Sequence, residues 1–186
     1  MAQLITRVTD PELFVDAGQI DIVDEGLECY VADESATGIV DARPGGSGAA
    51  VICATEIGHV VMTAELWDGP PPLCTDGWQD VADMPLHWLR DEAMEIGGEG
   101  TSLTEPPTFA LRAGLHMIRV AGRHRDEPDP RDDRAPAEEY LIQVWPAHPG
   151  AATAGPVLHK RTSALAARRT ALRAGLPRAG RGGTPG

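Results

Sequence analysis

Apolar and polar residues alternate along much of the chain with a period of two, which is typical of half-buried β-strands. The clearest example runs from His59 to Trp67, where every second residue from Val60 onward is apolar. The same alternation predicts strands over residues 116–121 and 140–145, the last of them stopped by a proline. We therefore predict a mostly β protein.

Turn signals between these segments predict three hairpins. The first has Asp24-Glu25-Gly26 at its centre and lies within residues 13–31. The second joins a short apolar strand over residues 50–55 to the 59–67 strand by a reversal at Glu56-Ile57-Gly58. The third turns at Ala113-Gly114 and leads into the strand that begins at His116.

Prolines indicate where strands cannot lie inside a sheet, because proline has no N–H to donate. Residues 78–89 alternate around Pro85, so we predict an edge strand there, and we expect residues 94–96 to continue it after a turn. With the hairpins, these segments predict an all-β fold, an antiparallel β-sandwich of about seven to nine short strands.

The chain of 186 residues suits one domain with an appendage. We predict an acidic β-sandwich domain over residues 1–146, with the folded body ending at Pro146. Residues 147–186 are read as an Ala/Pro/Gly-rich linker and a basic tail, helical over residues 160–174 and disordered from Gly175 onward.

The net charge of −12 hides a division along the chain. All 28 acidic residues precede residue 140, and seven of the 16 basic residues follow Pro156. Nine basic against 28 acidic residues leave a net charge of −19 on the first 155 residues. Such a body favours a protein partner with a basic surface and repels nucleic acid, whereas the tail alone can attract phosphates.

Cysteine use and apolar runs indicate the compartment. The three cysteines, Cys29, Cys53 and Cys74, have no paired spacing, and we interpret Cys29 and Cys53 as small buried apolar residues. No apolar run approaches the roughly 20 residues that cross a bilayer, and no signal peptide is evident at the start. We therefore expect a cytoplasmic protein without a membrane segment.

The segment from residue 126 to residue 139 is rich in carboxylates and prolines, which predicts an exposed loop. Solvated charge is the plain interpretation, with ion binding or partner docking as alternatives. An EF-hand is not expected, because Asp132 stands where that loop needs glycine. If a partner binds, the candidate contact residues are the loop carboxylates and one tryptophan: Asp126, Glu127, Asp129, Asp132, Asp133 and Trp67.

Other patterns predict little chemistry. Gly45-Gly46-Ser47-Gly48 lacks the residues of a phosphate loop or a nucleophile elbow and is interpreted as a turn. His116 and His124 could converge near Asp126 to hold a metal, but functionless histidines are commoner. We expect no catalytic residues, no metal and no cofactor.

Three segments carry a family resemblance: residues 78–83, residues 113–120 and the strand Glu139 to Pro146, of the Y-x-x-Q-x-W-P type. Together they resemble a family of uncharacterised bacterial cytoplasmic proteins. The layout also resembles competence-associated inhibitors of a DNA-entry nuclease, which are small acidic β proteins with an acidic stretch before the final strand. The chain departs from that pattern at His116 and Met117, near the usual tyrosine, and in its basic tail.

These observations predict a noncatalytic protein-binding domain, an inhibitor or immunity protein that covers a basic enzyme such as a nuclease. An alternative is a structural or assembly component that docks through its basic tail. A further alternative is a metal-dependent enzyme built on His116, His124 and Asp126.

Overall fold

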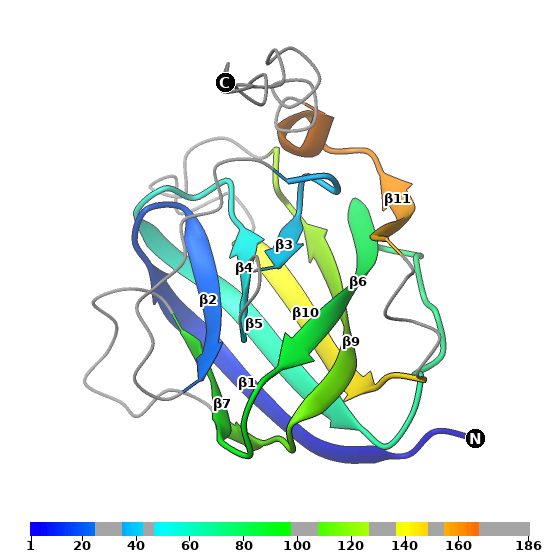
Figure 1. Ribbon diagram of the computed structural model, residues 1–186. Helices are drawn as coiled ribbons and strands as arrows, with labels where there is room; N and C mark the ends of the chain where they lie inside the picture. Colours follow the sequence, from blue (N-terminus) through cyan, green and yellow to red (C-terminus); the bar gives the residue numbers. More distant parts are fainter. Residues whose placement is uncertain (25–34, 43–46, 98–107, 127–136, 149–154, 168–186) are drawn as a thin grey trace, which may run out of the picture.

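Two β-sheets pack face to face in the computed structural model, which describes residues 1–24, 35–42, 47–97, 108–126, 137–148 and 155–167 (Figure 1). The six-stranded sheet contains, in spatial order, β1 (Leu4–Val15), β5 (Gly58–Trp67), β10 (Glu139–Pro146), β9 (Gly114–Arg123), β6 (Asp80–Trp88) and β11 (Val157–Arg161). The five-stranded sheet contains β3 (Val40–Ala42), β4 (Ala49–Ile52), β2 (Gln19–Asp24), β7 (Ala93–Gly97) and β8 (Thr108–Ala110). The predicted all-β architecture is confirmed, with eleven strands in the described residues rather than seven to nine.

One neighbouring pair departs from the predicted antiparallel arrangement. Strands β5 and β10 are parallel, with Val61 beside Glu139 and Leu66 beside Val144, whereas the other paired strands of the described residues are antiparallel. Strand β10 is antiparallel to β9, the strand before it in the chain, as in a hairpin. Strand β5 lies on the other side of β10 and runs in the same direction as β10, so this pair is parallel.

Two predicted hairpins are wrong, because their strands belong to different sheets. Strand β4 lies in the five-stranded sheet and β5 in the six-stranded sheet, so the turn at residues 56–58 crosses between sheets. The turn at Ala113-Gly114 makes the same crossing between β8 and β9. Alternation indicates which face of a strand is buried, not which sheet contains it. The second half of the first predicted hairpin lies outside the described residues, and β2 pairs with β4 and β7.

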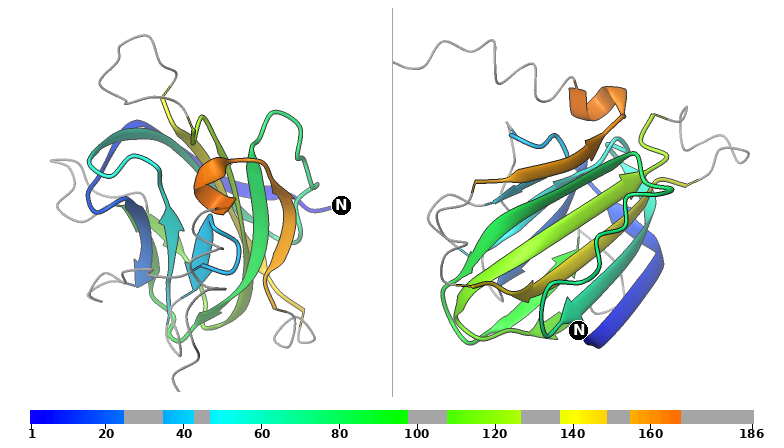
Figure 2. Two further views of the ribbon diagram at one scale, coloured as in Figure 1. Left: turned by 90° about the horizontal axis from the view of Figure 1, so that it is seen from above. Right: turned by 90° about the vertical axis from the view of Figure 1, so that its right-hand side faces the viewer.

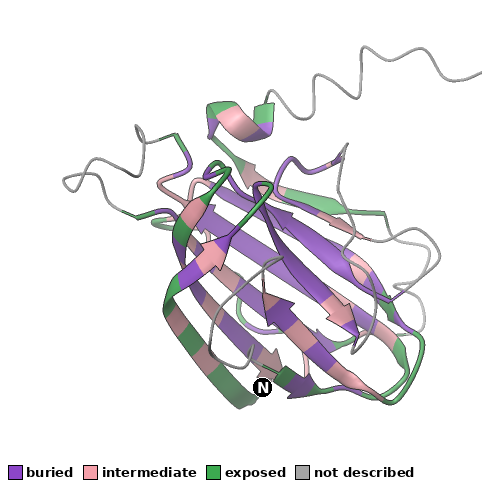
Figure 3. Ribbon diagram, turned by 90° about the vertical axis from the view of Figure 1, so that its left-hand side faces the viewer, coloured by how far each residue is buried: buried purple, intermediate pink, exposed green. Residues whose placement is uncertain are grey.

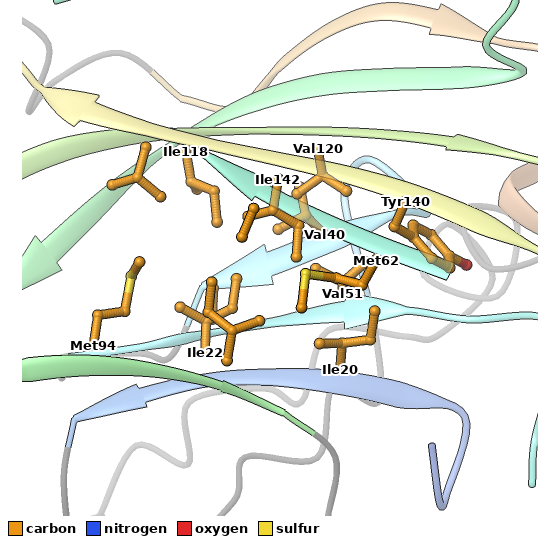
Figure 4. Close-up of a cluster of buried hydrophobic side chains, with 14 of the residues drawn as sticks. Ile20, Ile22, Val40, Val51, Met62, Met94, Ile118, Val120, Tyr140 and Ile142 are labelled. Atoms are coloured by element: carbon orange, nitrogen blue, oxygen red, sulfur yellow. The ribbon is translucent and has the colours of Figure 1, made fainter. Parts of the chain in front are cut away.

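The core lies between the sheets, where the inward faces of both meet (Figure 4). Ile118 and Ile142 of the six-stranded sheet point toward Ile20 and Ile22 of β2. Strand β5 buries Val60, Met62 and Ala64 of its predicted inner face and partly buries Leu66, and the alternation of buried and less buried residues recurs across the sheets (Figure 3). Cys53 is buried as predicted, Cys74 is exposed, and Cys29 lies outside the described residues.

Strand β6 is not an edge strand over its first half. Strand β11 pairs with it from Asp80 to Asp83, and Pro85 lies beyond that pairing, where its missing N–H costs no ladder bond on the β11 side. The predicted continuation over residues 94–96 is β7, which lies in the other sheet.

The outer face of the six-stranded sheet is partly covered by the connection between β5 and β6, which crosses in front of the strands in the right-hand view of Figure 2. Arg119 anchors this connection from β9. Its guanidinium donates to the carbonyl of Pro71 at 3.1 Å and to both carboxylate oxygens of Asp83 at 2.7 and 2.9 Å. The same group lies 5.1 Å from the ring of Trp145.

The predicted last strand is not the last, since β11 follows it and lies beside β6 (Figure 2). A helical turn over residues 164–167 continues the segment, with Ser163 and Ala166 buried. Gly38 permits this contact, because its φ is 77° and a Cβ there would lie 2.6 Å from the carbonyl oxygen of Ala166. Residues 157–167 therefore pack against the sandwich, and residues 168–186 of the predicted tail lie outside the described residues.

The division into a 1–146 domain and a 147–186 tail stays a prediction, which a truncation tests below. The described part of the chain contains no helix with the length and apolar content that a membrane span needs.

Candidate partner-binding site

The acidic loop leaves the sandwich between β9 and β10, at the end where the described C-terminal segment also lies (Figure 1). Residues 127–136 lie outside the described part of the chain, and so do four of the predicted contact residues, Glu127, Asp129, Asp132 and Asp133. The two stems of the loop are described. Strands β9 and β10 hold them side by side, with Arg123 opposite Glu139.

The outgoing stem, which leads from the loop into β10, is anchored by Glu138. Its two carboxylate oxygens accept the backbone N–H groups of Ala54 at 2.7 Å and Thr55 at 2.8 Å. These N–H groups follow β4, where the chain leaves one sheet for the other and the ladder no longer supplies acceptors. Charge-assisted bonds to backbone N–H groups are stronger than neutral ones, so Glu138 ties the loop firmly to the connection between β4 and β5.

The incoming stem, which leads from β9 into the loop, is anchored by Arg125, whose side chain is completely buried. Its guanidinium donates to the carbonyl oxygens of Ile52 at 2.8 Å and Gly38 at 3.1 Å, and it pairs with the carboxylate of Asp80, which is also fully buried. Burial alone would lower the pKa of Arg125, but Tyr140, Asp80 and Glu138 raise it above its usual value. The guanidinium therefore stays charged and connects three parts of the fold: β4, the bend that precedes β3, and β6.

The groups around Arg125 are unreactive. Burial, with the Glu138 charge, raises the pKa of the Cys53 thiol above its usual range, so the thiol stays protonated. Burial also raises the pKa of Tyr140, whose hydroxyl contacts the Glu138 carboxylate and lies 3.3 Å from Nε of Arg125. Because the Cys53 thiol and the Tyr140 phenol both stay protonated, neither supplies an anionic nucleophile. The network holds the fold together.

Asp126, the first predicted contact residue, has a structural partner. Both oxygens of its exposed carboxylate accept the N–H of Ala164 at 2.9 Å, and Oδ1 also lies 3.3 Å from the N–H of Leu165. Ser163 caps the same helical turn by accepting the N–H of Ala166 at 3.1 Å. Asp126 therefore connects the loop to the C-terminal segment.

The C-terminal segment is also held by Asp80. The carboxylate of Asp80 accepts the N–H groups of Thr162 at 2.9 Å and Ser163 at 3.1 Å, while it pairs with Arg125. The start of the acidic loop and the end of the described chain therefore share one buried carboxylate.

Trp67 does not join the acidic loop. It ends β5, while β10 runs parallel to β5 and begins beside Val61, so the loop stems and Trp67 lie at opposite ends of the sheet. Trp67 is half-buried and donates its Nε1–H to Glu65 at 2.8 Å. Burial alone would raise the pKa of Glu65, but hydrogen bonds from Gln143, Arg7 and Trp67 lower it below the usual value. Trp67 and the loop stems therefore do not form one surface.

The two candidate metal histidines do not converge. His116 faces Leu86 near one end of β9, and His124 follows the other end of that strand. Within the described ranges, no group of three or more His, Cys, Asp or Glu side chains is placed to hold a metal ion. His116 is instead a buried residue whose Nδ1 has no hydrogen-bond partner among the residues that the structure describes.

We expect His116 to make stability depend on pH. Burial lowers its pKa below the usual value, although a backbone bond to Gly114 opposes this. The unfolded chain then binds a proton more readily than the folded protein, so stability is full above about pH 6.5 and is lost as pH falls through the folded pKa. Urea unfolding between pH 7 and pH 5 measures this, with a slope of at most about 1.4 kcal/mol per pH unit from this residue.

His116→Gln removes the titrating group and should flatten that slope, whereas His87→Gln, at an exposed position of the neighbouring strand, should leave it unchanged. An identical slope in the His116→Gln variant and the unaltered chain would show that His116 titrates alike in both states.

Sequence reasoning missed the residues that form the anchors: Arg125, Asp80, Glu138 and Ser163. Glu138 is read from the sequence as part of the exposed loop over residues 126–139, and Arg125 directly precedes that loop. Asp80 opens a strand in a position where polar residues are ordinary. No periodicity distinguishes a buried ion pair from exposed charges, so the sequence carried no signal for this network.

No protein-family model matches the chain, and no curated protein matches it. Among solved structures, ComJ from Bacillus subtilis, described as an inhibitor of the DNA-degrading activity of NucA, is similar with a TM-score of 0.53 and 13% identity. That match covers 79% of this chain and 99% of ComJ. A protein described as crocagin biosynthetic gene J matches with a TM-score of 0.45 and 8% identity, over 80% of this chain and 99% of the other, which is too distant to support an argument. The predicted resemblance to inhibitors of a DNA-entry nuclease is thus present at the level of the fold.

Proposed function

We propose that the protein is a noncatalytic protein-binding domain that inhibits a basic enzyme, such as a nuclease, with its acidic loop as the principal contact. The observation that carries this proposal is the placement of the loop stems. The body has a net charge of −19, and its carboxylate-rich loop is anchored at both ends. Arg125 and Asp126 anchor the start of the loop, and Glu138 anchors its end.

Fixed stems favour binding by such a loop. A loop whose ends are already ordered loses less conformational entropy when it docks than one attached by frayed strands. Dense carboxylates also resemble the charge of a phosphate backbone and accelerate encounter with a cationic surface by about tenfold to a thousandfold. The fold shared with ComJ, an inhibitor of a DNA-degrading enzyme, supports the choice of a nuclease as the class of target.

The test begins with affinity capture from native lysate, followed by measurement of association rates with the purified captured protein. We expect the triple variant Asp129→Asn, Asp132→Asn, Asp133→Asn to associate more slowly and with a flatter salt dependence, because exposed charges are screened over about 8–10 Å. The activity of the captured enzyme, plasmid degradation if it is a nuclease, is measured with and without the protein.

A matched control removes the same three charges elsewhere: Glu12→Gln, Asp76→Asn and Glu95→Gln. Its charge change equals that of the loop variant, and it should retain most of the association rate because these three residues lie outside the acidic loop. Equal slowing in both variants would assign the effect to net charge, and no slowing in either would remove the loop from the interface. A captured enzyme whose activity is unaffected would contradict inhibition.

A further inference from the structure

The four edges of the two sheets differ in length. Strands β3 and β8 have three residues each and β11 has five, whereas β1 has twelve. Strand β11 also carries Lys160 and Arg161 and a register shift after Leu158, features that discourage pairing with another strand. Of the sheet edges that the structure describes, β1 therefore offers backbone N–H and C=O groups over the greatest length.

We propose that β1 pairs antiparallel with β1 of a second copy of this chain, so that the two six-stranded sheets become continuous. The pairing does not depend on the proposed inhibitory function. Its first support is exposure: Leu4 is 41% and Ile5 59% exposed, and β1 forms the green and pink border of the sheet in Figure 3. Long edges with exposed apolar residues are sites of strand addition.

The charges of β1 favour a second copy over a basic partner. Strand β1 carries Arg7, Asp10 and Glu12, and Arg7 already pairs with Glu65 of β5. Its paired segment from Thr6 to Asp10 holds one charge of each sign, so a strongly cationic protein gains little there, whereas a second copy meets no net repulsion from this segment.

The register within β1 is uninterrupted from Thr6 to Asp10, with irregularities on both sides. The middle of this segment is Val8. A two-fold axis perpendicular to the sheet at Val8 keeps both cores on the same side and places each Thr6 opposite Asp10 of the other copy and each Arg7 opposite Thr9. This register puts no like charges opposite each other, and the Thr6 hydroxyl can donate to the Asp10 carboxylate twice per dimer.

Sedimentation velocity on the full chain over a range of concentrations tests the proposal, and we expect a dimer with twice the 19.7 kDa chain mass. Two substitutions at the exposed Thr6 should then act in opposite directions. Thr6→Asp places carboxylates opposite Asp10 and should weaken the dimer about tenfold, whereas Thr6→Lys places opposite charges there and should strengthen it.

Leu158→Asp, on the other edge of the same sheet, is the control and should leave the dimer unchanged, and circular dichroism checks that each variant folds. A chain that stays monomeric up to about 100 μM would overturn the proposal, since symmetric interfaces of use to a cell associate well below that range. Equal weakening by Thr6→Asp and Thr6→Lys would overturn the register, and weakening by Leu158→Asp alone would move the interface to β11.

Discussion

Replacing Arg125 with methionine is expected to destabilise the protein by about 3–5 kcal/mol, because it leaves the buried carboxylates of Asp80 and Glu138 without their cation. The carbonyl oxygens of Ile52 and Gly38 lose a donor as well. Urea unfolding measures the loss as a lower midpoint at an unchanged slope.

The double variant Arg125→Met, Asp80→Leu should recover part of that loss, because it removes one of the stranded charges together with the cation. Arg112→Met removes a cation at an exposed position and should change the unfolding free energy by less than about 0.5 kcal/mol. If Arg125→Met costs no more than Arg112→Met, the network around Arg125 does not hold the fold.

Truncation after Pro156 is expected to lower the melting temperature by more than about 5 °C. The shortened chain loses β11, and the Asp80 carboxylate loses the N–H groups of Thr162 and Ser163. Asp126 also loses its helical turn, so the incoming stem of the acidic loop is held less firmly.

Truncation after Ala167 is the matched control, because it keeps every one of these contacts, and it should leave the melting temperature nearly unchanged. Calorimetry of the three chains makes the comparison. A chain ending at Pro156 that melts like the full protein would support the boundary predicted at residue 146 and would show that the C-terminal segment contributes little to stability.

Strand β5 is predictable from the sequence alone. Its alternation predicts both the strand and its buried face, because a strand half-buried in a sheet must place apolar residues at every second position. Alternation predicts strands β9 and β10 in the same way. Alternation does not predict hairpins, since a glycine turn such as the one at Gly114 is equally compatible with pairing in one sheet and with crossing to the other.

The candidate site was predictable in part. An acidic, proline-rich run between two strands marks an exposed loop whatever the fold around it, because such a run cannot bury apolar surface. The roles of its ends were not predictable. The sequence places Asp126 among the loop carboxylates as a candidate partner contact, and only its hydrogen bond to Ala164 reveals a capping role. Trp67 is a candidate contact as well, but the parallel pairing of β5 and β10 separates it from the loop.

The sequence by itself determined the fold class, the inner faces of the principal strands and the anionic character of the body, because period, turn residues and charge are local properties of the chain. The tertiary structure decided which sheet each strand joins, that β11 extends the six-stranded sheet, and that Arg125, Asp80 and Glu138 meet in the interior. These features depend on contacts between residues 13 to 84 positions apart, and no local pattern encodes them. A buried ion pair and two solvated charges consist of the same residue types, and only the residues packed around them in the tertiary structure decide whether they are buried.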